Sequence, residues 1–150
     1  MTDHDQLRER LLQLFSSQKL AVLATQEGGQ PYASLIAIAA SDDLKELFFA
    51  TPRATRKFAY LQANPKVALL IDSRSNQDED IHRAIAATVL GTAAEVGHEE
   101  RQEVLNHYLA RHPHLEEFAR SPSTALVRVT VQSYYVVSRF QEVMELHVAP

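Results

Sequence analysis

Residues 48–70 decide the fold of this chain, and they read FFATPRATRKFAYLQANPKVALL. Two apolar runs flank a segment of helical character, so the stretch predicts a strand, a helix and a second strand. Thr51 before Pro52 is typical of a helix N-cap followed by proline at the first helical position. Free backbone N–H groups would then point outward beside the cationic side chains of residues 53–57. The sequence therefore predicts an anion site at this junction, above all for a phosphate group.

Composition limits the kind of protein that the chain can form. Its 150 residues, of which 45% are hydrophobic, suit a single domain over residues 1–150. The formal net charge of -4 leaves no general basic field for nucleic acid or an anionic membrane, so we expect neither as a partner. The absence of cysteine excludes disulfides and thiolate metal sites, and no apolar run reaches the roughly 20 residues of a membrane span. We expect a cytoplasmic protein.

Periodicity along the chain predicts strands in hairpins with helices inserted between them. Helical spacing of apolar residues predicts an N-terminal helix at about 5–17 and further helices at about 52–63, 98–111 and 115–118. Apolar runs predict strands at 20–25, 32–40, 46–50, 66–72, 84–96 and 125–138, with a short tail strand at 143–148. No regular alternation of strand and helix occurs. The order favours a mainly β, α+β fold, an antiparallel barrel with peripheral helices.

Short segments in a particular order carry a resemblance to a known family. They are LAVLAT at 20–25, QPYAS at 30–34, the start of the opening stretch at 48–57, NPKV at 64–67 and GTAAE at 91–95. In this order and spacing the chain resembles the FMN-binding split-barrel family of the pyridoxamine 5′-phosphate oxidases and their smaller relatives, over residues 19–140. The resemblance implies a six-stranded antiparallel split β-barrel. It also implies a homodimer with one FMN in each of two clefts at the subunit interface.

The resemblance assigns the phosphate side of an FMN site to particular residues. Ala50 and Thr51 occupy the positions of a pair that contacts the flavin, and the triplet Thr55, Arg56 and Lys57 matches the group that binds the phosphate. Ser34 stands where the family usually has an arginine, so one phosphate cation is lost.

The assignments at the other end of the flavin rest on fewer matches. Arg53 could replace the lost cation. Val137 stands where the oxidases carry a large aromatic residue beside the flavin. A cation near the ring edge stabilises the reduced flavin anion. Arg74 with Ser75, or Arg139 near the last strand, could supply it, and the sequence does not choose between them.

The substrate side departs from the oxidase pattern. The chain has no Arg-x-His segment after the last long strand and ends in a tail at about 139–150. No catalytic residue can be named, because no general acid or base stands out. The expected function is an FMN-dependent oxidoreductase acting on an unidentified small molecule.

Other functions remain open at this stage. One is a flavin-binding or electron-carrier module without turnover, and another uses the deazaflavin cofactor F420. A third is haem binding or degradation, with His147 as the iron ligand. A separate metal site is not expected, because His107, His112 and His114 lie five and two residues apart around Pro113 and do not share one helical face.

Overall fold

The computed structural model describes residues 2–138 and 142–148. The helices are α1 (Asp3–Ser17), α2 (Arg56–Ala63), α3 (Asp80–Arg83), α4 (His98–Arg111) and α5 (Glu116–Arg120), with a 3-10 turn η1 (Pro113–Leu115) before α5. The strands are β1 (Leu20–Glu27), β2 (Gln30–Ala37), β3 (Ala39–Ala40), β4 (Glu46–Pro52), β5 (Lys66–Asp72), β6 (Ala86–Glu95), β7 (Thr124–Ser138) and β8 (Glu142–His147).

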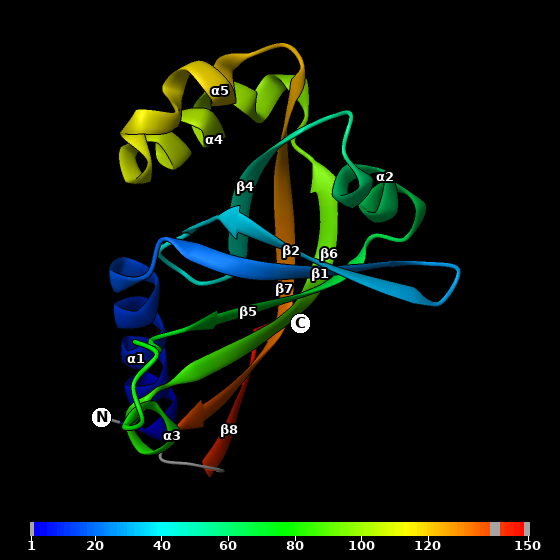
Figure 1. Cartoon of the computed structure of the whole chain (residues 1–150). Coiled ribbons are helices and arrows are strands. Elements are labelled where there is room, and N and C mark those ends of the chain that lie inside the picture. Colours follow the sequence, from blue (N-terminus) through cyan, green and yellow to red (C-terminus); the bar gives the residue numbers. More distant parts are fainter. Residues whose placement is uncertain (1, 139–141, 149–150) are drawn as a thin grey trace.

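All the strands belong to one antiparallel sheet that curls into a half-barrel (Figure 1). The order across the sheet is β2-β1-β5-β6-β7-β4-β3, and β8 pairs with the C-terminal part of β7. The expected α+β class and antiparallel split barrel are confirmed. The expected count of six strands is wrong, because the sheet has eight within residues 2–138 and 142–148. The second strand breaks at Ile38 into β2 and β3, and the tail strand β8 joins the sheet.

The concave face of the sheet holds the main core. Residues on this face of β1, β5 and β6 alternate with exposed ones, as the pleat of a strand requires. Helix α1 closes the core with Leu7, Leu11, Leu14 and Phe15, which recur at helical spacing. Each fully buried leucine stabilises the fold by roughly 2–3 kcal/mol. Thr2 caps this helix, since its hydroxyl accepts from the Asp5 N–H while the Asp5 carboxylate accepts from the Thr2 N–H.

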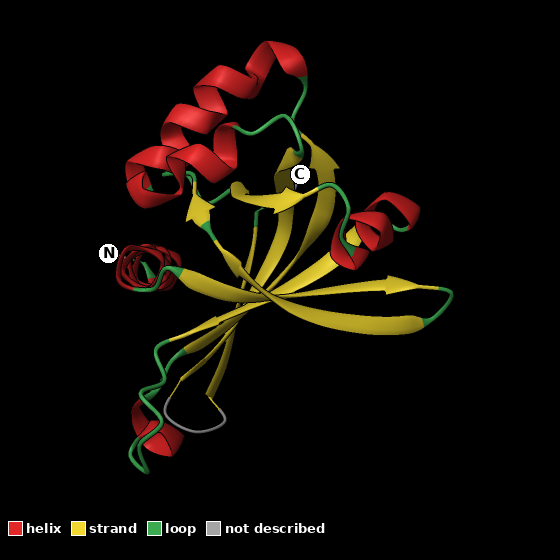
Figure 2. Ribbon diagram, turned by 45° about the horizontal axis from the view of Figure 1, so that its top comes forward, coloured by secondary structure: helices red, strands yellow, loops and turns green. Residues whose placement is uncertain are grey.

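A second, smaller core lies on the other side of β4, under α4 and α5 (Figure 2). Phe49 faces the main core, whereas Phe48 and Ala50 face the α4 side. Tyr108 and Leu105 of α4 meet them there. Strand β4 is therefore buried on both faces, which explains its nearly unbroken apolar sequence.

Helix α2 starts later than its sequence predicts. Thr51 was expected to be its N-cap, but it is paired with Ala125 in the β4–β7 ladder, and Pro52 is the last residue of β4. Thr55 is the N-cap, with its hydroxyl 3.3 Å from the Phe58 N–H. Both threonines precede helical sequence, and the strand pairing decides between them. The predicted end of the helix at Asn64 is confirmed.

Candidate functional site

The candidate site lies where β4 ends and α2 begins. Thr51 is fully buried, and its hydroxyl oxygen lies 3.3 Å from that of Thr55. The Lys57 ammonium group donates to the Thr51 hydroxyl over 3.2 Å. Ala50 does not join this group, because its side chain packs into the α4 core on the other face of β4. The structure therefore brings together Thr51, Thr55 and Lys57 from the predicted set.

Lys57 is a half-buried cation without a carboxylate partner among the described residues. Burial lowers the pKa of its ammonium group, because removal from water disfavours the charged form. An anion beside the ammonium group would reverse that effect and raise the pKa. The side chain is thus placed to bind an anionic ligand.

The first turn of α2 adds backbone donors to the same place. The N–H groups of Arg56 and Lys57 lie in this turn and have no intrahelical acceptor. The Thr55 hydroxyl donates to the Pro52 carbonyl over 2.9 Å and accepts from the N–H of Phe58, so it does not cap the N–H groups of Arg56 and Lys57. Donors of this kind, together with the positive end of the helix dipole, favour phosphate.

Arg56 connects α2 with strand β2, and Ser34 lies on the same strand. The guanidinium of Arg56 lies 5.5 Å from the ring centroid of Tyr32, which also meets the Tyr60 ring edge-on. Ser34 follows two residues after Tyr32 and therefore faces the same side of β2. Its hydroxyl oxygen is buried without a hydrogen-bond partner. A buried hydroxyl without a partner costs about 1–3 kcal/mol, so this position suits a group that supplies the missing bond.

Arg53 does not replace the cation that Ser34 lacks. Its guanidinium forms an ion pair of 2.6 Å with Glu95 at the end of β6 and also donates to the Pro122 carbonyl. The expected role of Arg53 in anion binding is therefore wrong. The pair instead ties the end of β4 to the neighbouring strands. The cation that packs on strand β2 is Arg56, over the ring of Tyr32.

Arg74 and Ser75 lie at the opposite end of the sheet from α2, in the segment before α3 (Figures 1 and 2). Arg74 pairs with Asp72 at 3.1 Å, and Ser75 donates to the Asp80 carboxylate at 2.9 Å. Within one subunit the structure does not bring them to the α2 site. Arg139 lies outside the described residues.

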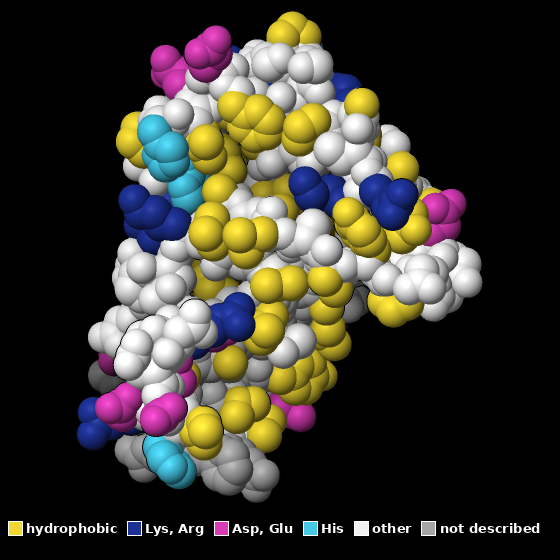
Figure 3. Space-filling model, viewed as in Figure 1, with side chains coloured by type: hydrophobic (Ala, Val, Ile, Leu, Met, Phe, Trp, Pro, Cys, Tyr) yellow, Lys and Arg dark blue, Asp and Glu magenta, His cyan; other side chains and the backbone are white. Residues whose placement is uncertain are grey.

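The convex face of the sheet is apolar. The sequence analysis did not identify the residues that make up this surface. Adjacent strands place their exposed apolar side chains on it in register, with Val22 opposite both Leu35 and Leu70. Figure 3 shows hydrophobic side chains gathered over the lower strands of the sheet. We call this surface the outer face, and its large exposed members are Leu20, Leu35, Leu70, Leu90 and Val137. Patches of this kind mark interaction surfaces.

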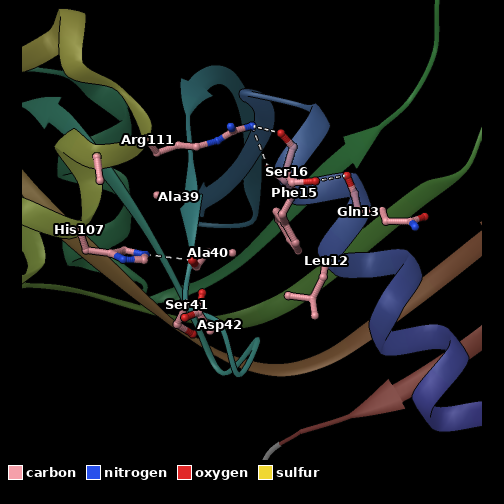
Figure 4. Close-up of a pocket in the computed structure, with 11 residues that line it drawn as sticks. Leu12, Gln13, Phe15, Ser16, Ala39, Ala40, Ser41, Asp42, His107 and Arg111 are labelled. Carbon is pink, nitrogen blue, oxygen red and sulfur yellow. Dashed lines mark hydrogen bonds between the residues drawn. The ribbon is translucent and has the colours of Figure 1, made fainter.

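Helix α4 is attached to the sheet and to α1 by polar side chains. The Tyr108 hydroxyl donates to the Ala37 carbonyl at 2.9 Å, and the buried His112 ring meets the Ile38 carbonyl at 2.8 Å. These carbonyls flank the break between β2 and β3. The His107 ring contacts the Ala40 carbonyl, and Arg111 donates to the last carbonyls of α1 (Figure 4). Sequence reasoning missed these contacts.

The hollow drawn in Figure 4 lies between α1, β3 and α4 and measures about 560 Å³. Its arginine, Arg111, donates hydrogen bonds to the carbonyls of Phe15, Ser16 and Gln18. The hollow therefore offers no unoccupied arginine to an anionic ligand, and its lining includes the Asp42 carboxylate, in contrast to the α2 site.

His147 has a partner on each ring nitrogen. Nδ1 lies 2.8 Å from the Ser133 hydroxyl, and Nε2 lies 3.1 Å from the Glu145 carboxylate. Iron ligation by either nitrogen would have to displace one of these partners. In the described part of the chain, no group of three or more histidine and acidic side chains could hold a metal ion. No helix in that part combines the length and apolar character needed to cross a membrane.

The chain belongs to the pyridoxamine 5′-phosphate oxidase family, whose model matches residues 7–138. A search of curated proteins finds no match to its sequence.

Three solved structures illustrate the likeness in fold. General Stress Protein 26 from Bacillus anthracis str. Sterne is 19% identical, with a TM-score of 0.71 over 95% of this chain and 99% of that one. A FAD-binding protein from Mesorhizobium loti is 16% identical, with a TM-score of 0.68 over 85% and 90%. A haem-binding protein from Mycobacterium smegmatis is 14% identical, with a TM-score of 0.82, and this chain spans 58% of its length. Likeness at such identity establishes the fold alone.

Proposed function

We propose that this protein binds FMN with its phosphate at the start of α2 and serves as an FMN-dependent oxidoreductase for a small molecule. The observation that carries the proposal is Lys57, a half-buried cation held by the Thr51 hydroxyl with no carboxylate partner among the described residues. Family membership and the FAD-binding neighbour from Mesorhizobium loti support a flavin as the ligand.

The donor set of the α2 site fits a phosphate dianion. Lys57 and Arg56 would neutralise its charge, while the first N–H groups of the helix would donate to its oxygens. The Thr55 hydroxyl would join these donors by exchanging its bond to the Pro52 carbonyl for one to the phosphate. The Thr51 hydroxyl keeps the Lys57 ammonium group in position. Ser34 would supply one more donor from β2, since its hydroxyl has no protein partner. When bound, the flavin ring supplies the redox chemistry, and the protein supplies position and charge.

We further propose that the outer face is covered by a second copy of this chain and that the cofactor lies at that interface. The exposed leucines occur on four adjacent strands, β2, β1, β5 and β6, and Val137 extends them onto β7. A stable dimer buries about 1,200–2,000 Å² in total, and a face of five strands can supply such an area. Arg74 and Ser75 lie far from α2 in one subunit, so they could approach a flavin only from the partner.

Binding of FMN and of riboflavin to the same protein tests the proposal. We expect Lys57→Ala to weaken FMN binding by roughly 10–100-fold, because it removes a charge-assisted hydrogen bond to the phosphate. Riboflavin lacks the phosphate and should lose less than about 3-fold. Lys45→Ala, which removes an exposed lysine in a turn, is the matched control. Equal losses for the two flavins, or none, would overturn the phosphate assignment.

Turnover separates the enzyme from an electron carrier that uses the same site. After reduction of the bound flavin, repeated reoxidation by a small-molecule acceptor supports the oxidoreductase. A single stoichiometric reoxidation supports the carrier.

Haem binding is the competing function, because one structural neighbour is a haem-binding protein. His147 is committed to Ser133 and Glu145, which does not favour it as an iron ligand. A Soret band on haem addition that disappears in His147→Ala would support haem over FMN.

A further inference from the structure

A second group of cationic and hydroxyl side chains lies at the end of the sheet away from α2. They line a hollow of about 470 Å³ between α1 and the segment 73–85 that joins β5 to β6 through α3. Arg10 and Ser17 come from α1, Ser73 and Arg83 from the joining segment, and Ser138 from the end of β7. No aspartate or glutamate is among the described residues that line it. We call this hollow the α1–α3 hollow.

Two hydroxyls in the α1–α3 hollow have hydrogens to donate. The Ser73 oxygen accepts from the Ile85 N–H at 3.0 Å, and the Ser138 oxygen accepts from the Arg10 guanidinium at 3.4 Å. A hydroxyl that accepts a hydrogen bond still has its own hydrogen to donate, and neither of these O–H groups has a hydrogen-bond acceptor among the described residues. Ser138 is only 6% exposed, so this unmatched donor is not a surface feature. Donors without acceptors favour a ligand that only accepts.

The two arginines of the α1–α3 hollow differ from the paired arginines of this protein. Arg53, Arg74, Arg120 and Arg128 each form an ion pair with a carboxylate. Arg10 and Arg83 form none within the described residues, and the only side-chain hydrogen bond of either is that from Arg10 to Ser138. An unpaired guanidinium can bind a phosphate through two parallel hydrogen bonds.

Acidic side chains lie near both arginines and reduce the positive electrostatic potential of the hollow. Arg10 also borders a neighbouring hollow with Asp3, Glu142 and Glu145, and Arg83 borders one with Glu79 and Asp80. These carboxylates face other hollows. We therefore expect an anion to bind with modest affinity and only in the α1–α3 hollow, which both arginines line.

We propose that the α1–α3 hollow binds the phosphate group of a small organic phosphomonoester. The hollow has the size of small-molecule sites, and it is larger than a phosphate group alone requires. Leu14 and Ile85 give it an apolar wall for the organic part. The site shares no residue with the α2 site, so the proposal does not depend on FMN binding.

Titration with phenyl phosphate and with inorganic phosphate, followed by ³¹P NMR, tests the proposal. The protein carries Lys57→Gln throughout, so that the α2 site does not contribute. We expect phenyl phosphate to bind more tightly than inorganic phosphate, and Arg83→Gln to weaken it by about 5–30-fold. Ser138→Ala should weaken it by about 2–5-fold.

Arg120→Gln is the matched control, because it removes the same charge from an arginine paired with Glu116 far from the hollow in sequence. Arg83 lies on the exposed helix α3, so its replacement leaves the core intact. Equal weakening by Arg120→Gln and Arg83→Gln would show a general charge effect and overturn the proposal. Binding of phenyl phosphate that Arg83→Gln leaves unchanged would also overturn the proposal. So would the absence of phenyl phosphate binding to the starting protein at about 10 mM, a concentration at which even a weak site is occupied.

Discussion

The α4 end and the α2 end of the molecule treat their buried polar groups in opposite ways. At the α4 end, Tyr108 and His112 are buried, and each reaches a backbone carbonyl at the β2–β3 break. At the α2 end, the Ser34 hydroxyl has no hydrogen-bond partner, and the Lys57 ammonium group has only the Thr51 hydroxyl as a partner among the described residues. Satisfied polar groups stabilise the fold, whereas unsatisfied ones cost stability and persist where a ligand completes them. The comparison supports a structural role for α4 and the binding role that we propose for α2.

The largest expected effect is on stability at the α4 end. Tyr108→Ala should lower the free energy of unfolding by about 3–5 kcal/mol, because it empties a fully buried aromatic site and leaves the Ala37 carbonyl without its donor. The matched change Tyr60→Ala, at a half-buried tyrosine of α2, should cost roughly 1 kcal/mol. Urea unfolding followed by circular dichroism measures both values. Equal losses would contradict the contrast between the two ends.

The next largest effect is on dimer formation. It bears on the contrast between the two ends, because in the proposed dimer a second copy of the chain would complete the binding site at the α2 end. Leu35→Glu puts a charge on the β2 part of the outer face, where the leucine is 63% exposed, and should weaken the dimer by roughly 100-fold. Leu12→Glu changes an exposed leucine of α1 that lies outside this face and should have no effect on assembly. Light scattering after gel filtration measures the mass. A wild-type monomer would remove the proposed interface.

A third effect follows from the pKa of His112. Burial lowers this pKa in the folded protein, and the nearby Arg111, His114 and Lys19 lower it further, while the bond to Ile38 opposes them. In the unfolded chain, the His112 imidazole takes up a proton near pH 6.5, whereas in the folded protein it stays neutral at that pH. Stability is therefore complete above about pH 6.5 and falls as the pH is lowered through that range.

His112→Asn provides the comparison, because asparagine can still donate to the Ile38 carbonyl but does not titrate. Between pH 7.5 and 5.5 its melting temperature should fall by less than that of the wild type. Parallel falls in the two proteins would show that His112 is not the titrating group.

The smallest expected effect is on the stability of the ligand-free α2 site. Thr51→Val keeps the shape of a buried side chain and removes a hydroxyl that serves Lys57, so unfolding should change by no more than about 1 kcal/mol. FMN binding should weaken in the same variant, because Lys57 loses its support. A large loss of stability would indicate that Thr51 is structural.

Local pattern predicted much of the fold, since the alternation in β1, β5 and β6 and the apolar spacing of α1 and α4 are each contained within one element. The start of α2 was not predictable from local pattern, because Thr51 and Thr55 are equal as caps until β4 pairs with β7. Sequence also grouped Thr51, Thr55 and Lys57, which the structure brings together. It could not show that Glu95 removes Arg53 from the group, since the two residues meet only through the fold of the sheet.

The same limit applies to the groups that define the two ends. Tyr108 and Ala37 lie 71 residues apart, and nothing in either segment indicates their hydrogen bond. The buried state of the Ser34 hydroxyl depends on the elements packed over β2. Convergence of distant residues is what the structure adds.

The most direct test of the central claim is the rise in melting temperature that saturating FMN produces in the wild type and in Lys57→Ala. A ligand that binds only the folded state stabilises it in proportion to the logarithm of its affinity. We predict a clear rise in the wild type, little or none in Lys57→Ala, and similar melting temperatures for the two proteins without FMN. A full rise in Lys57→Ala, or a large loss of stability in that variant before FMN is added, would contradict the assignment of a binding role to α2.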